Sequence, residues 1–226
     1  YMPIKYGNSL TNKLKRRSAA GKAYWQEEGV TGLPFVIAVA DFHKPASEDE
    51  LGSMTYTQSA IWAYLYGFTT DWEMVDGKLV PTNRDLKSHT FKGKTIESGF
   101  FSLPDAENVS AVVFSNAGTL AKFDRIGVLA GYAPPKHRYI RAGFRYDPDP
   151  NAVVGKRFFE EVGNGDYSEG WADELQVFHN PRALRPLPKE CFGNLTQHFF
   201  EDGQLVTYSG ESAVISSFTM ILQTTD

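Results

Sequence analysis

The sequence predicts an α+β, mixed α/β protein with a central mixed β-sheet, an early helix-strand crossover unit and a β-rich C-terminal half. Three observations lead to this fold class. A helical pattern comes first, residues 35–40 form an apolar run typical of a buried strand, and strand patterns dominate after residue 108. Helices early and strands late are the order typical of this class.

The first predicted element is a helix over residues 9–25. Asn8 or Ser9 suits its N-cap, and apolar residues at helical spacing follow as far as Trp25. Gly21 falls within this pattern and costs about 1 kcal/mol relative to alanine in a helix interior, so the pattern also allows a break near it.

The next element is the strand over residues 35–40, which is apolar on both faces and therefore typical of a central strand covered on each side. We expect Val36, Ile37, Ala38 and Val39 to be buried. A helix followed at short distance by such a strand forms half of a crossover unit, whose partner strand is expected before residue 8.

Later patterns add a helix over residues 59–66 and a hairpin turning at Asp76-Gly77. Residues 108–127 are interpreted as a strand, a turn at 116–118 and a second strand. Further strands are predicted at 174–179, 195–201 and 204–208, the last two joined by a tight turn at Asp202-Gly203.

Length and composition set the domain organisation and the compartment. A chain of 226 residues, 42% of them hydrophobic, can bury a sizeable core. We expect one domain over residues 1–226, with a possible division into a helix/strand core (1–95) and a β-rich extension (96–226). The chain opens on Tyr1, so an N-terminal part is expected to be missing.

The single cysteine, Cys191, cannot form an internal disulfide and is expected to be a small buried side chain. The first thirty residues contain no apolar run like a secretion signal, which indicates a reducing cytoplasm. No span is long and apolar enough for a membrane helix, so we expect no membrane association.

Charge is unevenly distributed along the chain. The net charge of −4 disfavours a protein that binds polyanions with its whole surface, yet residues 1–26 carry six basic side chains and no acidic one. A second basic stretch, residues 122–145, precedes the acid-rich residues 147–174. The alternative to a polyanion-binding surface is that these cations pair with the acidic segment. The candidate nucleic-acid-binding residues are Lys13, Lys15, Arg16, Arg17 and Lys22.

Three residues are candidates for catalysis: Asp41, His43 and His179. Asp41 and His43 lie on one face of an extended segment, where the carboxylate could orient the imidazole or hold a divalent cation. The alternative is that Asp41 caps the turn at residues 44–45. His179, like His198, flanks a predicted strand and is a candidate acid/base group or a hydrogen-bonded structural histidine. The sequence has no phosphate-binding glycine loop, serine elbow or zinc-spaced histidine pair.

A succession of segments carries a family resemblance: KYGNSLTNKLKRR, GLPFVIAVADFH, YLYG, ENVSAVVFSNAGTLAKFDRIG and VFHNPRALRPLP. They resemble a family of uncharacterised bacterial proteins associated with the PD-(D/E)XK, restriction-endonuclease-like fold. The resemblance covers nearly the whole chain. It implies a metal-dependent nuclease, with Mg²⁺ or Mn²⁺ as cofactor and DNA or RNA as partner. The catalytic (D/E)-x-K motif has no match here, and the resemblance places those carboxylates upstream of Tyr1.

The predicted function is therefore a nucleic-acid-binding, nuclease-like (phosphodiesterase) protein whose basic segment contacts phosphates. Two alternatives stay open. One is a non-catalytic module that interacts with a protein or ligand, and the other is a hydrolase that uses Asp41, His43 and His179. Convergence of these three side chains in one pocket would favour the hydrolase.

Overall fold

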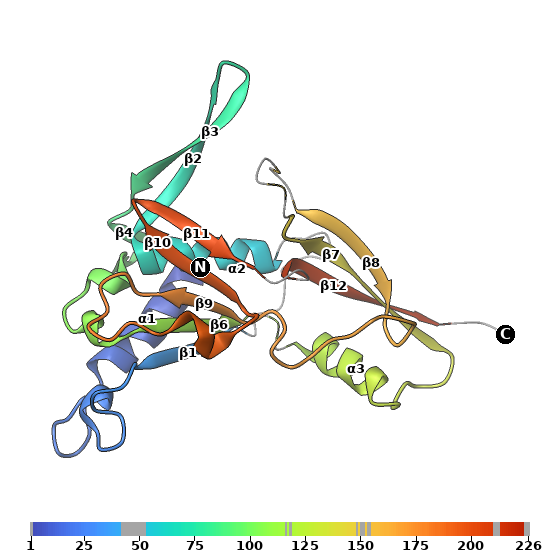
Figure 1. Ribbon diagram of the computed structural model, residues 1–226, viewed down its shortest axis with the longest axis horizontal. Coiled ribbons are helices and arrows are strands. Elements are labelled where there is room, and N and C mark those ends of the chain that lie inside the picture. Colours follow the sequence, from blue (N-terminus) through green and yellow to red (C-terminus); the bar gives the residue numbers. More distant parts are fainter. Residues whose placement is uncertain are drawn as a thin grey trace.

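The computed structural model describes residues 2–41, 53–115, 117, 119–147, 149, 152, 155–209 and 213–223. It is a mixed α/β structure with a central five-stranded mixed sheet and a strand-rich C-terminal half, as the sequence predicts (Figure 1). In the first half, the order of elements is α1 (Met2–Lys15), β1 (Val36–Ala40), α2 (Ser53–Tyr66), β2 (Phe68–Val75), β3 (Lys78–Asp85), β4 (Ser88–Phe91) and β5 (Lys94–Glu97).

The second half contains β6 (Ala111–Ser115), α3 (Leu120–Leu129) and the remaining strands, and short 3-10 helices occur in both halves. The strands are β7 (His137–Arg145), β8 (Lys156–Glu161), β9 (Gln176–His179), β10 (Thr196–Glu201), β11 (Gln204–Tyr208) and β12 (Val214–Gln223). The 3-10 helices are η1 (Tyr24–Gln26), η2 (Phe100–Ser102), η3 (Ala106–Asn108) and η4 (Lys189–Phe192). No helix in these described ranges is long and apolar enough to cross a membrane.

The five-stranded sheet has the order β1-β6-β9-β10-β11. β1 pairs in parallel with β6, β6 is antiparallel to β9, β9 is parallel to β10, and β10 forms a hairpin with β11. The connection from β1 to its parallel neighbour β6 contains α2. The crossover thus joins β1 to a later strand, whereas the sequence placed the partner strand before residue 8.

The prediction of a central strand at residues 35–40 was wrong, because β1 lies at the edge of the sheet. Of the residues expected to be buried there, Ile37 is buried and Ala38 is exposed. The neighbouring strand β6 lies inside the sheet, and its residues Ala111, Val112, Val113 and Phe114 are all buried. An apolar run identifies a strand but does not decide which of two such runs lies inside the sheet.

The helix predicted over residues 9–25 begins and ends earlier, at Met2 and Lys15. Pro3 lies in its first turn, where the missing N–H removes no intrahelical bond. A turn at Gly21, with a φ of 77°, separates α1 from η1, so the helix ends before the glycine that weakened the prediction.

Residues 120–129 form helix α3, where the sequence predicted a second strand. Thr119 caps the helix, and its side chain accepts a hydrogen bond from the Lys122 backbone N–H. The predicted turn at 116–118 lies mostly outside the described residues. The hairpin at Asp76-Gly77 and the strands at β9, β10 and β11 are confirmed.

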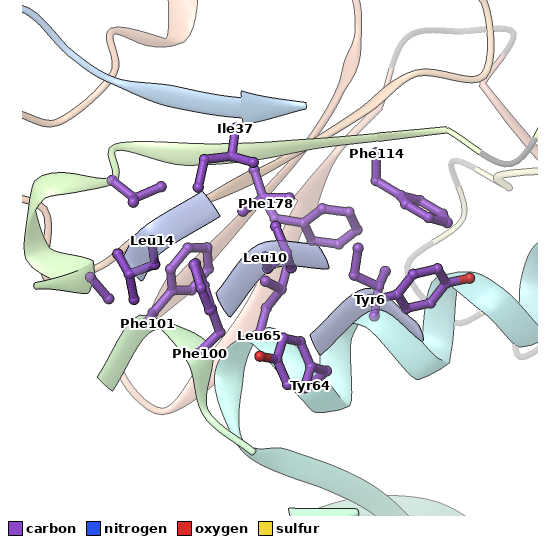
Figure 2. Close-up of a cluster of buried hydrophobic side chains, with 14 of the residues drawn as sticks. Tyr6, Leu10, Leu14, Ile37, Tyr64, Leu65, Phe100, Phe101, Phe114 and Phe178 are labelled. Atoms are coloured by element: carbon purple, nitrogen blue, oxygen red, sulfur yellow. The ribbon is translucent and has the colours of Figure 1, made fainter. Parts of the chain in front are cut away.

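The main core lies on one face of the five-stranded sheet. Figure 2 shows side chains of α1, including Leu10 and Leu14, between strand residues such as Phe178 and the α2 residues Tyr64 and Leu65. Alternation along β6 sends Val112 and Phe114 into this core and their neighbours to the opposite face. That opposite face is covered by a smaller apolar cluster that includes Leu175, Leu187, Phe192 and Leu195.

A second sheet, of order β12-β7-β8, lies beside α3 on the right of Figure 1. β12 pairs with β7 from Val214↔Arg145 to Gln223↔His137. It also contacts helix α2, which packs in the main core. The apolar cluster around Ala117 and Val214 is small, with Phe158 packed against it. Buried charged side chains also lie between α3 and this sheet.

Candidate nucleic-acid interface

The predicted basic residues lie at the C-terminal end of α1 and in the connection to η1. Lys13 and Lys15 belong to the last turn of the helix, and Arg16, Arg17 and Lys22 follow it. All five are exposed. Cations in this position complement the negative end of the helix dipole, so their presence agrees with helix formation as well as with anion binding.

Tyr24 organises two of these cations. Its ring stacks on Phe35, with ring centroids 6.1 Å apart and planes 18° apart. Lys13 Nζ lies 5.8 Å and Arg16 Cζ 5.7 Å from the centroid of the Tyr24 ring, within cation–π range. Neither cation has a carboxylate partner among the described residues. The ring thus holds two positive charges together at the surface without neutralising them.

Arg17, unlike Lys13 and Arg16, has a carboxylate partner in the described part of the chain. Its Nη1 donates to the Leu14 carbonyl at 2.9 Å, and its Nη2 donates to Asp105 Oδ2 at 2.9 Å. The guanidinium also lies 5.5 Å from the Trp25 ring. Arg17 therefore caps α1 and ties it to the segment after η2, and its charge is already paired.

Asp41 lies at the end of β1 with 7% of its surface exposed. Its Oδ2 accepts a hydrogen bond from Tyr6 Oη at 2.9 Å, and its backbone N–H donates to the Ser115 carbonyl at 2.7 Å. The carboxylate therefore connects α1 to the sheet. His43 lies outside the described residues, as does the turn at 44–45 that Asp41 was alternatively expected to cap.

His179 and His198 lie on the neighbouring strands β9 and β10. His179 Nε2 hydrogen-bonds Gln197 Oε1 at 2.8 Å, and His198 Nε2 hydrogen-bonds Gln176 Oε1 at 3.0 Å. Burial lowers the pKa of His179, and burial followed by the charge of His179 lowers the pKa of His198 to about 3. Both imidazoles are hydrogen-bonded, and burial favours the neutral form of each.

The structure does not bring Asp41 and His179 together. β1 and β6 run in parallel, so Asp41 follows the end at which Ala40 pairs with Ser115. β9 runs the other way, and His179 pairs with Ala111 at the opposite end of β6. Strand direction thus separates the two side chains that the hydrolase alternative needed in one pocket.

Five side chains that the sequence did not single out form a buried ionic cluster between α3 and β7. Arg125 donates to both oxygens of Glu169, at 2.7 and 2.6 Å, and Arg141 hydrogen-bonds Glu174 Oε1. Lys122 Nζ lies 3.7 Å from Glu174 Oε2. The five side chains are at most 5% exposed. The alternative that the second basic stretch pairs with the acidic segment is thereby confirmed.

Electrostatics within this ionic cluster agree with its geometry. Burial raises the pKa of Glu169, but the Arg125 hydrogen bonds and the Arg141 charge outweigh burial and hold the pKa below its usual range. Burial and a hydrogen bond to Glu169 raise the pKa of Tyr167 to about 12. The sequence indicated this cluster only through its order of charges, basic over 122–145 and acidic over 147–174. Which cation pairs with which carboxylate is decided by the tertiary structure.

No three His, Cys, Asp or Glu side chains within the described ranges are grouped so that they could hold a metal ion. Cys191, expected to be buried, is exposed on η4.

Comparisons with protein-family models, with curated proteins and with solved structures found no match to this chain. The resemblance to PD-(D/E)XK proteins stays a prediction, because no comparison bears on it.

Proposed function

We propose that the chain binds nucleic acid through a basic surface made of Lys13, Lys15, Arg16 and Lys22. The observation that carries the proposal is the pair of cations held at the Tyr24 ring with no carboxylate partner in the described chain. Cations fixed in this way meet phosphates with a smaller loss of side-chain entropy than freely moving ones. Phosphate contacts of this kind position a nucleic acid without reading its sequence.

The proposal covers binding and assigns no catalytic residue. Phosphodiester cleavage by the predicted nuclease type needs carboxylates that hold one or two divalent cations. The hydrolase alternative loses its support because Asp41 and His179 lie at opposite ends of β6. A cytoplasmic location belongs to the same proposal, supported by the lone, unpaired Cys191.

A titration at two salt concentrations tests the proposal. Labelled single-stranded DNA and RNA are titrated with the wild type and with Lys13→Ala/Arg16→Ala, following fluorescence anisotropy. We expect the double variant to bind about tenfold more weakly at low salt and to flatten the salt slope by about 1.4, because each lost phosphate contact removes about 0.7 counterions on a single strand.

The matched control removes two other exposed cations, Lys78 and Lys87, which lie in β3 and just before β4. Lys78→Ala/Lys87→Ala changes the net charge equally, so it should reduce affinity much less. The proposal fails if the wild type shows no measurable affinity at low salt. It also fails if the two double variants lose affinity equally.

The hairpin β2–β3 favours the alternative of an interaction module. Figure 1 shows this hairpin standing out from the rest of the molecule. Trp72 is 58% and Met74 67% exposed, and both share a face with Pro81 because Trp72 pairs with Pro81. Binding of a second copy through this face would appear as concentration-dependent mass in light scattering, lost in Trp72→Ser. A wild type that stays monomeric at high concentration would rule out self-association through this face.

A further inference from the structure

A groove with a volume of about 490 Å³ runs along α1, next to the basic surface. One wall is the helix itself. The other is formed by β5 and the segment after η2, including Ile96, Leu103 and Pro104. This volume lies in the range of sites that enclose small ligands, about 300–1,000 Å³. We call it the α1 groove.

The helix wall of the α1 groove is polar. Asn8, Asn12 and Lys15 are spaced by four and three residues, which places them in one row on the same face of α1. At a rise of about 1.5 Å per residue, this row extends about 10 Å along the groove. Each asparagine amide offers two N–H donors and a carbonyl acceptor, so the row can satisfy a ligand that has both kinds of group.

The floor of the α1 groove depends on Gly7. A Cβ at this position would collide with Ile96 Cδ1 and lie 2.8 Å from the Tyr64 ring, so glycine is required for the close approach of α1 to both side chains. Tyr64 Oη lies 3.2 Å from Thr11 Oγ1 and 3.4 Å from the Gly7 carbonyl. These contacts fix the floor, so that the groove is already formed without a ligand.

The opposite wall of the groove is apolar. Two charged side chains at the groove indicate which groups a ligand would carry. Ile96 and Leu103 are half-buried, so a flat ring could lie against them. Asp105 is paired with Arg17, which leaves Lys15 and Glu97 as the charges facing the groove. Lys15 suits an anionic group, and Glu97 suits an amino group. A planar ring with donors and acceptors, joined to a phosphate, combines these features.

We propose that the α1 groove binds one base of a single-stranded nucleic acid whose phosphates lie on the basic surface. The inference rests on the proposed function, because Lys15 belongs both to the groove and to that surface. A base in a duplex is stacked and paired, whereas a single strand can turn one base out against a protein wall. The asparagine row then contacts the edge of the base, and the apolar wall contacts its face.

The test compares a base-containing oligonucleotide with an abasic sugar-phosphate oligomer of equal length. We expect the wild type to bind the base-containing strand about tenfold more tightly, as a single well-packed base warrants. Asn8→Ala/Asn12→Ala should lose this preference while keeping its affinity for the abasic strand. Ser9→Ala is the matched control, since Ser9 is exposed on α1 and does not line the groove.

The possible failures are distinguishable. If the wild type binds both strands equally and Lys13→Ala/Arg16→Ala weakens both, the groove assignment is overturned and the proposed function stands. A loss of abasic affinity in Asn8→Ala/Asn12→Ala, together with a lowered thermal midpoint, would make the asparagines structural and overturn the groove assignment as well. No binding of either strand at low salt overturns both proposals.

Discussion

Two regions of the molecule place a helix beside a sheet, yet they are held together by different side chains. Between α1, α2 and the five-stranded sheet the contacts are apolar, with Leu10, Phe100 and Phe178 fully buried. Between α3 and the β12-β7-β8 sheet the buried contacts are the ionic cluster, defined by Lys122, Arg125, Arg141, Glu169 and Glu174. One interface depends on area removed from water, and the other on the geometry of charged hydrogen bonds.

This difference predicts how the stability of each region responds to substitutions. An apolar interface loses stability in proportion to the volume removed, because its contacts are numerous and individually weak. A buried ion pair responds to which partner is removed, because a charge left without its partner keeps its full desolvation cost. The ionic cluster has three cations and two anions, so loss of an anion leaves the larger excess of charge.

The largest effect is expected from breaking the ionic cluster. Glu169→Leu removes the bidentate partner of Arg125, leaves three cations against one carboxylate, and should lower the free energy of unfolding by about 4 kcal/mol. Arg125→Met/Glu169→Leu removes both charges and should recover much of that loss, since apolar replacement of a buried pair is often neutral. Urea unfolding of the wild type, both single variants and the double variant measures the coupling. Additive losses would show that the pair does not act as a unit.

A somewhat smaller effect is expected in the apolar core. Leu10 is fully buried between α2 and the sheet, so Leu10→Ala should cost about 3 kcal/mol through lost transfer energy and the cavity left behind. The same urea titrations apply. No second change in the ionic cluster should rescue it, and Leu10→Ala combined with Arg125→Met should be additive. A loss below about 1 kcal/mol would mean that the core closes around the missing atoms.

The smallest effect, over the range from pH 7 to 5, is a dependence on pH. Burial lowers the pKa of His198 to about 3, so on acidification the unfolded chain takes up a proton before the folded chain does. Stability therefore falls as the pH drops from about 6.5 toward 3, by up to about 1.4 kcal/mol per pH unit. The lowered pKa of Glu169 adds a loss only below about pH 4.5, where unfolded glutamate protonates.

Unfolding at pH 7, 6 and 5 measures this pH effect. His198→Gln should flatten the decline between pH 7 and 5, because the buried imidazole whose pKa is lowered is then absent. Equal slopes for the wild type and His198→Gln would contradict a neutral, buried His198.

Much of the secondary structure followed from local patterns. The hairpin at Asp76-Gly77 and the β10–β11 hairpin formed as predicted, because their turn residues allow a positive φ and specify the pairing locally. Helix α3 was not predicted because Thr119 and the residues after it are compatible with a strand or a helix. Thr119 acts as an N-cap only once the helix has formed and packed. The sequence identified the basic residues of the candidate site, but it did not show that Arg17 pairs with Asp105, 88 positions away.

The sequence by itself determined which segments are apolar, where the chain turns and where positive charge gathers, since these depend on neighbours along the chain. Only the tertiary structure decided that β1 lies at the sheet edge, that Asp41 and His179 lie at opposite ends, and that Arg125 meets Glu169. The physical reason is that strand order, strand direction and ion pairing are contacts between distant positions. They are chosen by the summed packing of the whole chain, which no local pattern contains.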